Sequence, residues 1–70
     1  MAEELRQKFS KNLKFFREKV GLTQVGLAQR LKISARYVQQ LEGKRVPNVR
    51  LDTLEQIAKI LGICPSFLIK

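Results

Sequence analysis

The sequence predicts an all-α protein, a compact bundle of five short helices. Three observations support this fold class. Apolar residues recur at spacings of three and four along most of the chain, which is the period of an amphipathic helix. The residues that interrupt these stripes are typical helix caps and helix stops, namely Ser, Thr, Asn, Gly and Pro. No stretch shows the strict alternation of a half-buried strand.

The first predicted helix covers residues 3–20. Its inward stripe consists of Leu5, Phe9, Leu13, Phe16 and Val20. Gly21 follows at the position where a helix often ends in a left-handed residue, so we expect the helix to stop there. Phe15 lies off the stripe, and it is either partly exposed or covers the C-terminal segment.

The second and third predicted helices are short, and each follows a good N-cap residue. Thr23 precedes the second helix and Ser34 the third, which runs to about Glu42. The residues expected to face inward are Leu27, Ala28 and Leu31 on the second helix and Val38 and Leu41 on the third. Gly26 weakens the second helix by roughly 1 kcal/mol relative to Ala, so packing must hold that helix in place.

The fourth predicted helix starts after Asn48, the third expected N-cap, and Gly62 closes it. Its inward stripe comprises Leu51, Leu54, Ile57, Ala58 and Leu61. A short fifth helix begins at Pro65, because proline is favoured at the first helical position. Residues 67 and 68 then fold back onto the core, and Cys64 is expected to be a packed thiol.

Length and composition predict a single domain over residues 1–70, with a core over about residues 5–68. The chain is 44% hydrophobic, has one Cys and has no His. This composition excludes a disulfide framework within the chain and a Cys/His zinc site, and it removes the commonest general base. We therefore expect no cofactor, no metal and no enzyme activity. No apolar run approaches the roughly 20 residues of a membrane span. Without a signal-peptide pattern, the expected location is the cytoplasm.

The charge distribution points to a polyanionic partner. The chain carries 14 Lys and Arg against 6 Asp and Glu, a net charge of +8. Residues 30–50 contain six basic residues and one acidic residue, Glu42. Taken alone, this cluster fits a solvated surface as well as a binding face.

Residues 24–42 have the organisation of a helix-turn-helix. A turn of about three residues joins the two short helices, and the small side chain of Ala28 permits them to cross closely. The outer face of the second of these helices has no core function, and it presents Ala35, Arg36, Gln39 and Gln40. Arg pairs bidentately with guanine O6 and N7, and Gln with adenine N6 and N7. The pattern therefore predicts binding of double-stranded DNA through the major groove.

The chain resembles the lambda-repressor and Cro-like helix-turn-helix family, also called the XRE family, over about residues 9–68. The matching segments are TQVGLAQRLKISARYVQQLEGKRVP and, after it, LDTLEQIAKILGI. The resemblance implies a five-helix bundle whose recognition helix starts near Ala35. It implies base reading by Ala35, Arg36, Gln39 and Gln40. For Arg36 a phosphate contact is the main alternative, and for the two glutamines an exposed face without function.

The predicted phosphate-binding residues are Arg17, Thr23, Gln24, Lys32, Tyr37, Lys44, Arg45 and Asn48. The resemblance implies that Gln24 contacts a phosphate and that the loop with Lys44, Arg45 and Asn48 binds the DNA backbone. It also implies that Arg17 pairs with Glu42. That pair has a purely structural alternative, which is to tie the first helix to the end of the third. Lys32 stands where the family usually has glycine, so it is either a phosphate ligand or a strained turn residue. The ring of Tyr37 fits packing between helices equally well, and Thr23 and Asn48 also fit capping roles.

The predicted function is that of a sequence-specific transcriptional regulator, acting as a homodimer on a two-fold symmetric operator. Residues 63–69, from Ile63 to Ile69, are the predicted dimer surface because they are strongly apolar. A phage-type repressor, a restriction–modification controller and an antitoxin all fit this description. No small-molecule ligand is expected in this domain. The alternatives are a protein-interaction adaptor on the same fold, an enzyme and a membrane-surface peptide. The polar outer face disfavours the adaptor, and the absence of His disfavours the enzyme. The internal core disfavours the membrane-surface peptide.

Overall fold

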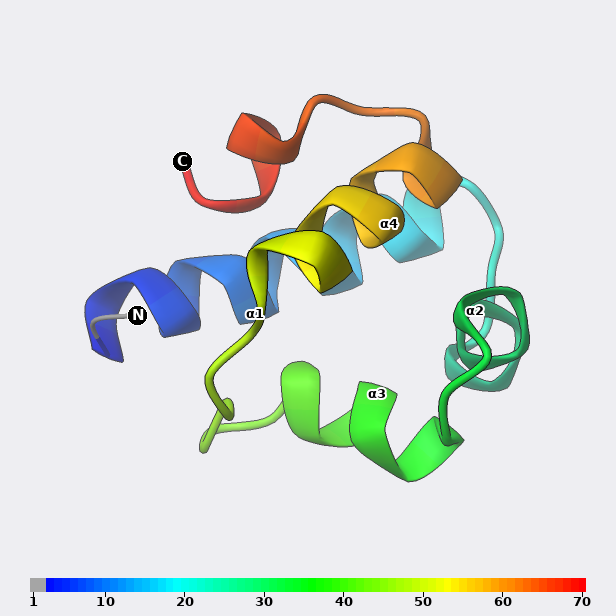
Figure 1. Ribbon diagram of the computed structural model, residues 1–70, viewed down its shortest axis with the longest axis horizontal. Coiled ribbons are helices and arrows are strands. Elements are labelled where there is room, and N and C mark those ends of the chain that lie inside the picture. The colour runs from blue at the N-terminus through cyan, green and yellow to red at the C-terminus, as the bar shows by residue number, and fades with distance from the viewer. Residues whose placement is uncertain (1–2) are drawn as a thin grey trace.

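Residues 3–70 are described by a computed structural model, and within this range the fold is built from helices without strands (Figure 1). The four α-helices are α1 (Glu3–Lys19), α2 (Gln24–Leu31), α3 (Ala35–Leu41) and α4 (Leu51–Leu61). The all-α prediction is confirmed. The predicted fifth helix is a single 3₁₀ turn, η1 (Pro65–Leu68), so the described part has four α-helices and not five. Four residues are enough for i→i+3 bonds but make little more than one α-helical turn.

Figure 1 shows α3 and the C-terminal segment at opposite sides of the bundle, with α1 and α4 between them. The interior is one hydrophobic cluster to which every element contributes. Its largest fully buried side chains are Phe9, Leu13, Leu27, Val38, Leu41, Ile57 and Leu68. Each such side chain contributes roughly 1.5–3 kcal/mol relative to exposure. The central members of all the predicted stripes are therefore core residues.

Three end residues of the predicted stripes are not core residues, although Leu61 at the end of the α4 stripe is buried. Leu5 and Val20, at the two ends of the α1 stripe, are 38% and 48% exposed, and Leu51 at the start of α4 is 75% exposed. Helical period marks the face of these residues correctly, but the core does not extend as far along the axis as the stripe does. Phe15, which lies off the stripe, is exposed.

Two of the three predicted N-caps are confirmed. Thr23 Oγ1 accepts a hydrogen bond from the Gly26 amide (2.9 Å), and Ser34 Oγ accepts one from the Tyr37 amide (3.1 Å). The prediction for Asn48 is wrong, because Arg50 stands at the N-cap of α4 and makes no side-chain capping bond. The chain approaches α4 without helical structure and buries Val46 and Val49, so the helix begins later than the local signal indicates.

The C-terminal segment folds back onto α1. Of the two residues predicted to reach the core, Leu68 does so, whereas the prediction for Phe67 is wrong because its side chain stays 40% exposed. Asn12 Nδ2 donates to the carbonyl oxygens of Leu68 (3.1 Å) and Lys70 (3.3 Å), and Leu68 is fully buried. Cys64 is exposed, which corrects the expectation of a packed thiol. Its side chain makes no capping bond to η1, so nothing in the described geometry draws it inward.

The turn between α2 and α3 contains a strained residue. Lys32 has φ 59° and ψ 41°, a left-handed conformation, and its amide donates to the carbonyls of Ala28 and Gln29. Gly21 and Gly62 adopt the same conformation at the ends of α1 and α4, where no Cβ opposes it. The expected strain at Lys32 is therefore present.

We expect Lys32→Gly to raise the unfolding free energy by up to about 1 kcal/mol, because it removes the left-handed penalty. Urea denaturation followed by circular dichroism measures this change. Arg30→Gly, two residues earlier and inside α2, is the matched control and should cost about 1 kcal/mol. A Lys32→Gly variant that is as stable as the parent protein, or less stable, would show that Lys32 is unstrained.

Candidate nucleic-acid interface

The outer face of α3 is polar and free of core contacts. Val38 and Leu41 are fully buried, while Arg36, Gln39 and Gln40 are exposed. Positions i, i+3 and i+4 lie on one side of a helix, so these three side chains form a single outward face. Ala35, at the first position of α3, is half-buried and packs against the core, which corrects the expectation that it has no core function. The four predicted base-reading residues thus stand on α3, and their contact with bases stays a prediction.

The position of α3 is fixed by its packing on α2. Ala28 on α2 is 2% exposed, and it is the small residue expected where two short helices cross. Its carbonyl accepts the amide of Ile33 (3.0 Å), which closes the turn before α3. Tyr37 is half-buried and packs against the core, which favours the packing role over a phosphate contact for its ring.

A buried carboxylate links three elements at the exit of α3. Glu42 accepts hydrogen bonds from Arg17 Nε (2.6 Å) and Nη2 (3.0 Å) and from Gln24 Nε2 (3.2 Å). Arg17 Nη1 also donates to the Leu22 carbonyl (2.7 Å). The side chains of Arg17 and Glu42 are only 9% and 3% exposed. This arrangement confirms the pair and supports its structural role. A phosphate contact by Arg17 stays a prediction that the burial disfavours.

The pair with Glu42 keeps Arg17 in its charged form. The pKa of Arg17 is raised above its ordinary value, chiefly by its hydrogen bonds to Glu42, although burial opposes this shift. Because the pKa is higher in the folded protein, the ion pair stabilises the fold fully at any pH below the ordinary pKa of arginine. This stabilisation is lost only as the pH rises through the pKa of Arg17 in the folded protein. The pKa of an arginine side chain ordinarily lies far above physiological pH, so Arg17 stays charged throughout that range.

The other predicted phosphate ligands lie around α3. Lys44, Arg45 and Asn48 are exposed in the loop that follows α3, and Lys32 is exposed in the turn before it. Thr23 and Gln24 stand at the N-terminus of α2, with Thr23 exposed and Gln24 half-buried. These residues belong to the segments that precede and follow the recognition face, and their contacts with phosphate stay predictions.

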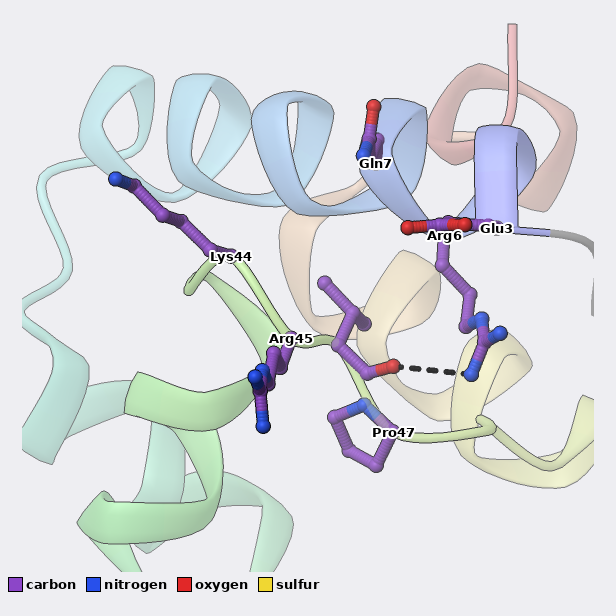
Figure 2. Close-up of a pocket in the computed structure, with 7 residues that line it drawn as sticks. Glu3, Arg6, Gln7, Lys44, Arg45 and Pro47 are labelled. Carbon is purple, nitrogen blue, oxygen red and sulfur yellow. Dashed lines mark hydrogen bonds between the residues drawn. The ribbon is translucent and has the colours of Figure 1, made fainter.

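Figure 2 shows how α1 meets the loop after α3. Lys44 and Arg45 extend from the loop in different directions, while Arg6 reaches from α1 and donates from Nη1 to the Val46 carbonyl (3.3 Å). The pocket beside this contact has a volume of about 340 Å³ and is also lined by Gln7. Sequence reasoning missed Arg6. The only signal was a polar residue next to the apolar stripe of the first helix.

Other kinds of site find no support among the described residues. Across residues 3–70 there is no group of three or more His, Cys, Asp or Glu side chains placed to hold a metal ion. In the same range, every helix is too short or too polar to cross a membrane.

Comparison with known proteins gives a consistent result. A helix-turn-helix family model matches residues 13–68. A hypothetical transcription factor, NHTF from Neisseria, is 32% identical with a TM-score of 0.87, covering 97% of this chain and 76% of that one. The clp gene regulator ClgR from Corynebacterium glutamicum is 26% identical with a TM-score of 0.83, covering 91% and 67%. No protein of curated function matches closely enough to count as a relative.

The fold also occurs inside a larger chain. Hydroxypropylphosphonic acid epoxidase from S. wedmorenis is 26% identical with a TM-score of 0.92, and the match covers 99% of this chain. The present chain spans 36% of the length of that protein. The likeness therefore extends over a helical unit and not over the whole of that protein.

Proposed function

The chain belongs to the XRE-type helix-turn-helix family, and from this premise we propose that it is a sequence-specific, double-stranded DNA-binding transcriptional regulator. The observation that carries the proposal is the outer face of α3. This face has no core function, presents Arg36, Gln39 and Gln40, and lies between basic segments. Similarity to a transcription factor and to a gene regulator supports the same function.

In the proposed complex, α3 lies in the major groove. Arg36 is the strongest candidate for a bidentate contact with guanine, and Gln39 and Gln40 for contacts with adenine. Ala35 is the candidate for contact with a thymine methyl group. These residues supply the discrimination between sequences, and DNA shape adds to it.

Affinity in the proposed complex comes mainly from contacts with phosphate. Lys44 and Arg45 are exposed in the loop that follows α3, and the net charge of the chain is +8. Neutralised phosphates release counterions, so binding should weaken steeply as the salt concentration rises. An adaptor that binds protein through this fold would lack both the sequence preference and an affinity for DNA at moderate salt.

We propose further that the chain acts as a homodimer. Half-sites of a two-fold operator lie about 34 Å apart. The described residues extend 27 Å along their longest axis and contain a single α3, so one copy offers one recognition helix for one half-site. The surface expected to dimerise was residues 63–69. Within it Leu68 is buried, whereas Phe67 is 40% exposed and its ring lies beside that of Phe16 on α1.

We propose that a second copy covers Phe67 of this surface together with Phe15 and Phe16 of α1, and that these three residues form one aromatic patch. The rings of Phe15 and Phe16 meet edge to face with centroids 5.1 Å apart, and those of Phe16 and Phe67 are 6.3 Å apart. Lys19 and Lys70 lie over the rings of Phe15 and Phe67. Because η1 and α3 are at opposite sides of the bundle, the patch leaves α3 free for DNA (Figure 1).

We expect Phe15→Gln to raise the dissociation constant of the dimer about tenfold, as loss of an aromatic side chain at an interface centre does. Sedimentation equilibrium measures this constant. Leu51→Gln removes an apolar side chain that is even more exposed, at the start of α4, and should leave the constant unchanged. A parent protein that stays monomeric at high concentration, with or without operator DNA, would exclude the proposed dimer.

Selection from a randomised duplex library tests the proposed function. The bound fraction is recovered, sequenced and selected again until the pool stops changing. A regulator that reads DNA with α3 should enrich one site, and a dimer should enrich it as an inverted repeat. A pool that stays random after repeated selection would contradict sequence-specific regulation. The search would then turn to protein partners of an adaptor.

A further inference from the structure

We propose that Arg6 and Ser10 on α1 are positioning residues that hold the loop after α3 (residues 42–50) so that Lys44 and Arg45 meet the DNA backbone. This inference rests on the proposed function, because it assumes that the loop contacts phosphate. It adds two residues, neither of which is on the recognition face, to those on which binding depends.

The contacts form a series along one face of α1. Ser10 Oγ donates to the Gly43 carbonyl (3.3 Å), and Arg6 Nη1 donates to the Val46 carbonyl (3.3 Å). Residues 6 and 10 are four apart, so their side chains lie on the same side of the helix. Arg17 extends the series on the same helix through its ion pair with Glu42. From one end of α1 to the other, polar side chains therefore hold successive points of the loop.

The two bonds bracket the basic residues. Gly43 and Val46 come directly before Lys44 and directly after Arg45, and their carbonyls are the groups that α1 holds. Val46 is buried, whereas Lys44 and Arg45 are exposed. The backbone of the loop is thus fixed on both sides of the two cations, whose side chains extend into solvent (Figure 2).

The cost of placing Arg6 here suggests a role beyond stability. Its Nε is buried and makes no hydrogen bond in the described part of the chain. A buried donor without a partner is unfavourable, and native structures keep few of them. An apolar side chain would cover the same surface without that cost, but it would not bond the Val46 carbonyl.

The loop after α3 has no regular helix or strand of its own. The side-chain bonds from α1 therefore contribute more to its order than they would within a helix. Residues 42–50 have neither α-helical nor strand structure, and Pro47 lacks an amide hydrogen. Without contacts to α1, the entropy of ordering the loop would have to be met when DNA binds. Fixing the loop beforehand lowers that cost and strengthens each phosphate contact.

Fluorescence titration of DNA with the Arg6→Gln variant is the first test. We expect affinity to fall about fivefold on both a selected and a scrambled duplex, because phosphate contacts are independent of sequence. Lys8→Gln removes the same charge from an exposed position two residues further on, and should change affinity less than about twofold. Ser10→Ala removes the second bond without any change of charge, and should weaken binding in the same manner. Equal losses for Arg6→Gln and Lys8→Gln would overturn the proposal.

Two further readouts separate positioning from other roles. In a Lys44→Gln/Arg45→Gln background, Arg6→Gln should have almost no further effect on affinity, because the residues through which it acts are gone. An undiminished loss there would assign Arg6 a direct phosphate contact and contradict the proposal. In the free protein, amide order parameters of residues 44–46 should fall in Arg6→Gln and Ser10→Ala but not in Lys8→Gln. Unchanged order parameters would also contradict it. This last test does not depend on DNA, so failure of the proposed function leaves it intact.

Discussion

Replacing Glu42 with Leu should lower the unfolding free energy by about 3–5 kcal/mol, the usual cost of removing one partner of a buried ion pair. The variant leaves the Arg17 guanidinium buried with only the Leu22 carbonyl as an acceptor, and Gln24 loses its bond as well. A domain of this length has a total stability of roughly 4–10 kcal/mol. Thermal or urea unfolding followed by circular dichroism should therefore show a variant close to the limit of folding.

A double-mutant cycle identifies the cause. Arg17→Met should be about as harmful as Glu42→Leu, while the double variant should recover most of the loss, because an apolar pair replaces a desolvated ionic one. Glu18→Gln, an exposed acidic neighbour of Arg17 in sequence, should change stability by less than about 0.5 kcal/mol. Additive losses in the double variant, or single losses below about 1 kcal/mol, would mean that the pair behaves as a surface salt bridge.

Replacing Arg36 with Ala should relax the choice of base at one position in each half-site. We expect the preference for the best base to fall by about 1–3 kcal/mol, the discrimination that a bidentate arginine supplies. The measurement is a titration of the selected site and its three single-base alternatives at that position. The parent protein should distinguish the four duplexes, and the variant should bind them with similar affinity.

The control for this prediction is a variant that weakens binding without altering the preference. Lys44→Gln should reduce affinity about equally for every duplex and lower the slope of log K against log salt by about 1. If Arg36→Ala shows the same uniform loss, Arg36 is a phosphate ligand. In that case the reading of bases must lie with Gln39 and Gln40.

Local sequence signals predicted most of the helices because those signals act within the helix itself. The caps at Thr23 and Ser34 bond to amides three residues further along the chain, so they depend on nothing remote. The prediction for the start of α4 was wrong because that start depends on remote contacts. Asn48 after Pro47 is a good local signal, but burial of Val46 and Val49 keeps that segment out of the helix. Tertiary packing outweighed the capping preference there.

The candidate site was predictable only in part. Helical period alone separates the buried pair Val38 and Leu41 from the outer face of α3. The bonds of Arg6 and Ser10 to the loop join residues 40 and 33 positions apart, so they depend on where the loop passes over α1. Nothing in the sequence near these residues reports that path. Helical period places a polar residue on a face of α1 but does not identify the residue it meets.

The most direct test of sequence-specific DNA binding is the ratio of affinities for the selected duplex and a scrambled duplex of the same composition, measured at two salt concentrations. For a specific regulator we predict a ratio of at least about 10³ that persists at both salt concentrations, while both absolute affinities fall as salt rises. Equal affinities that decline together with salt would contradict this prediction. The basic surface around α3 would then bind DNA by charge alone, without reading its sequence.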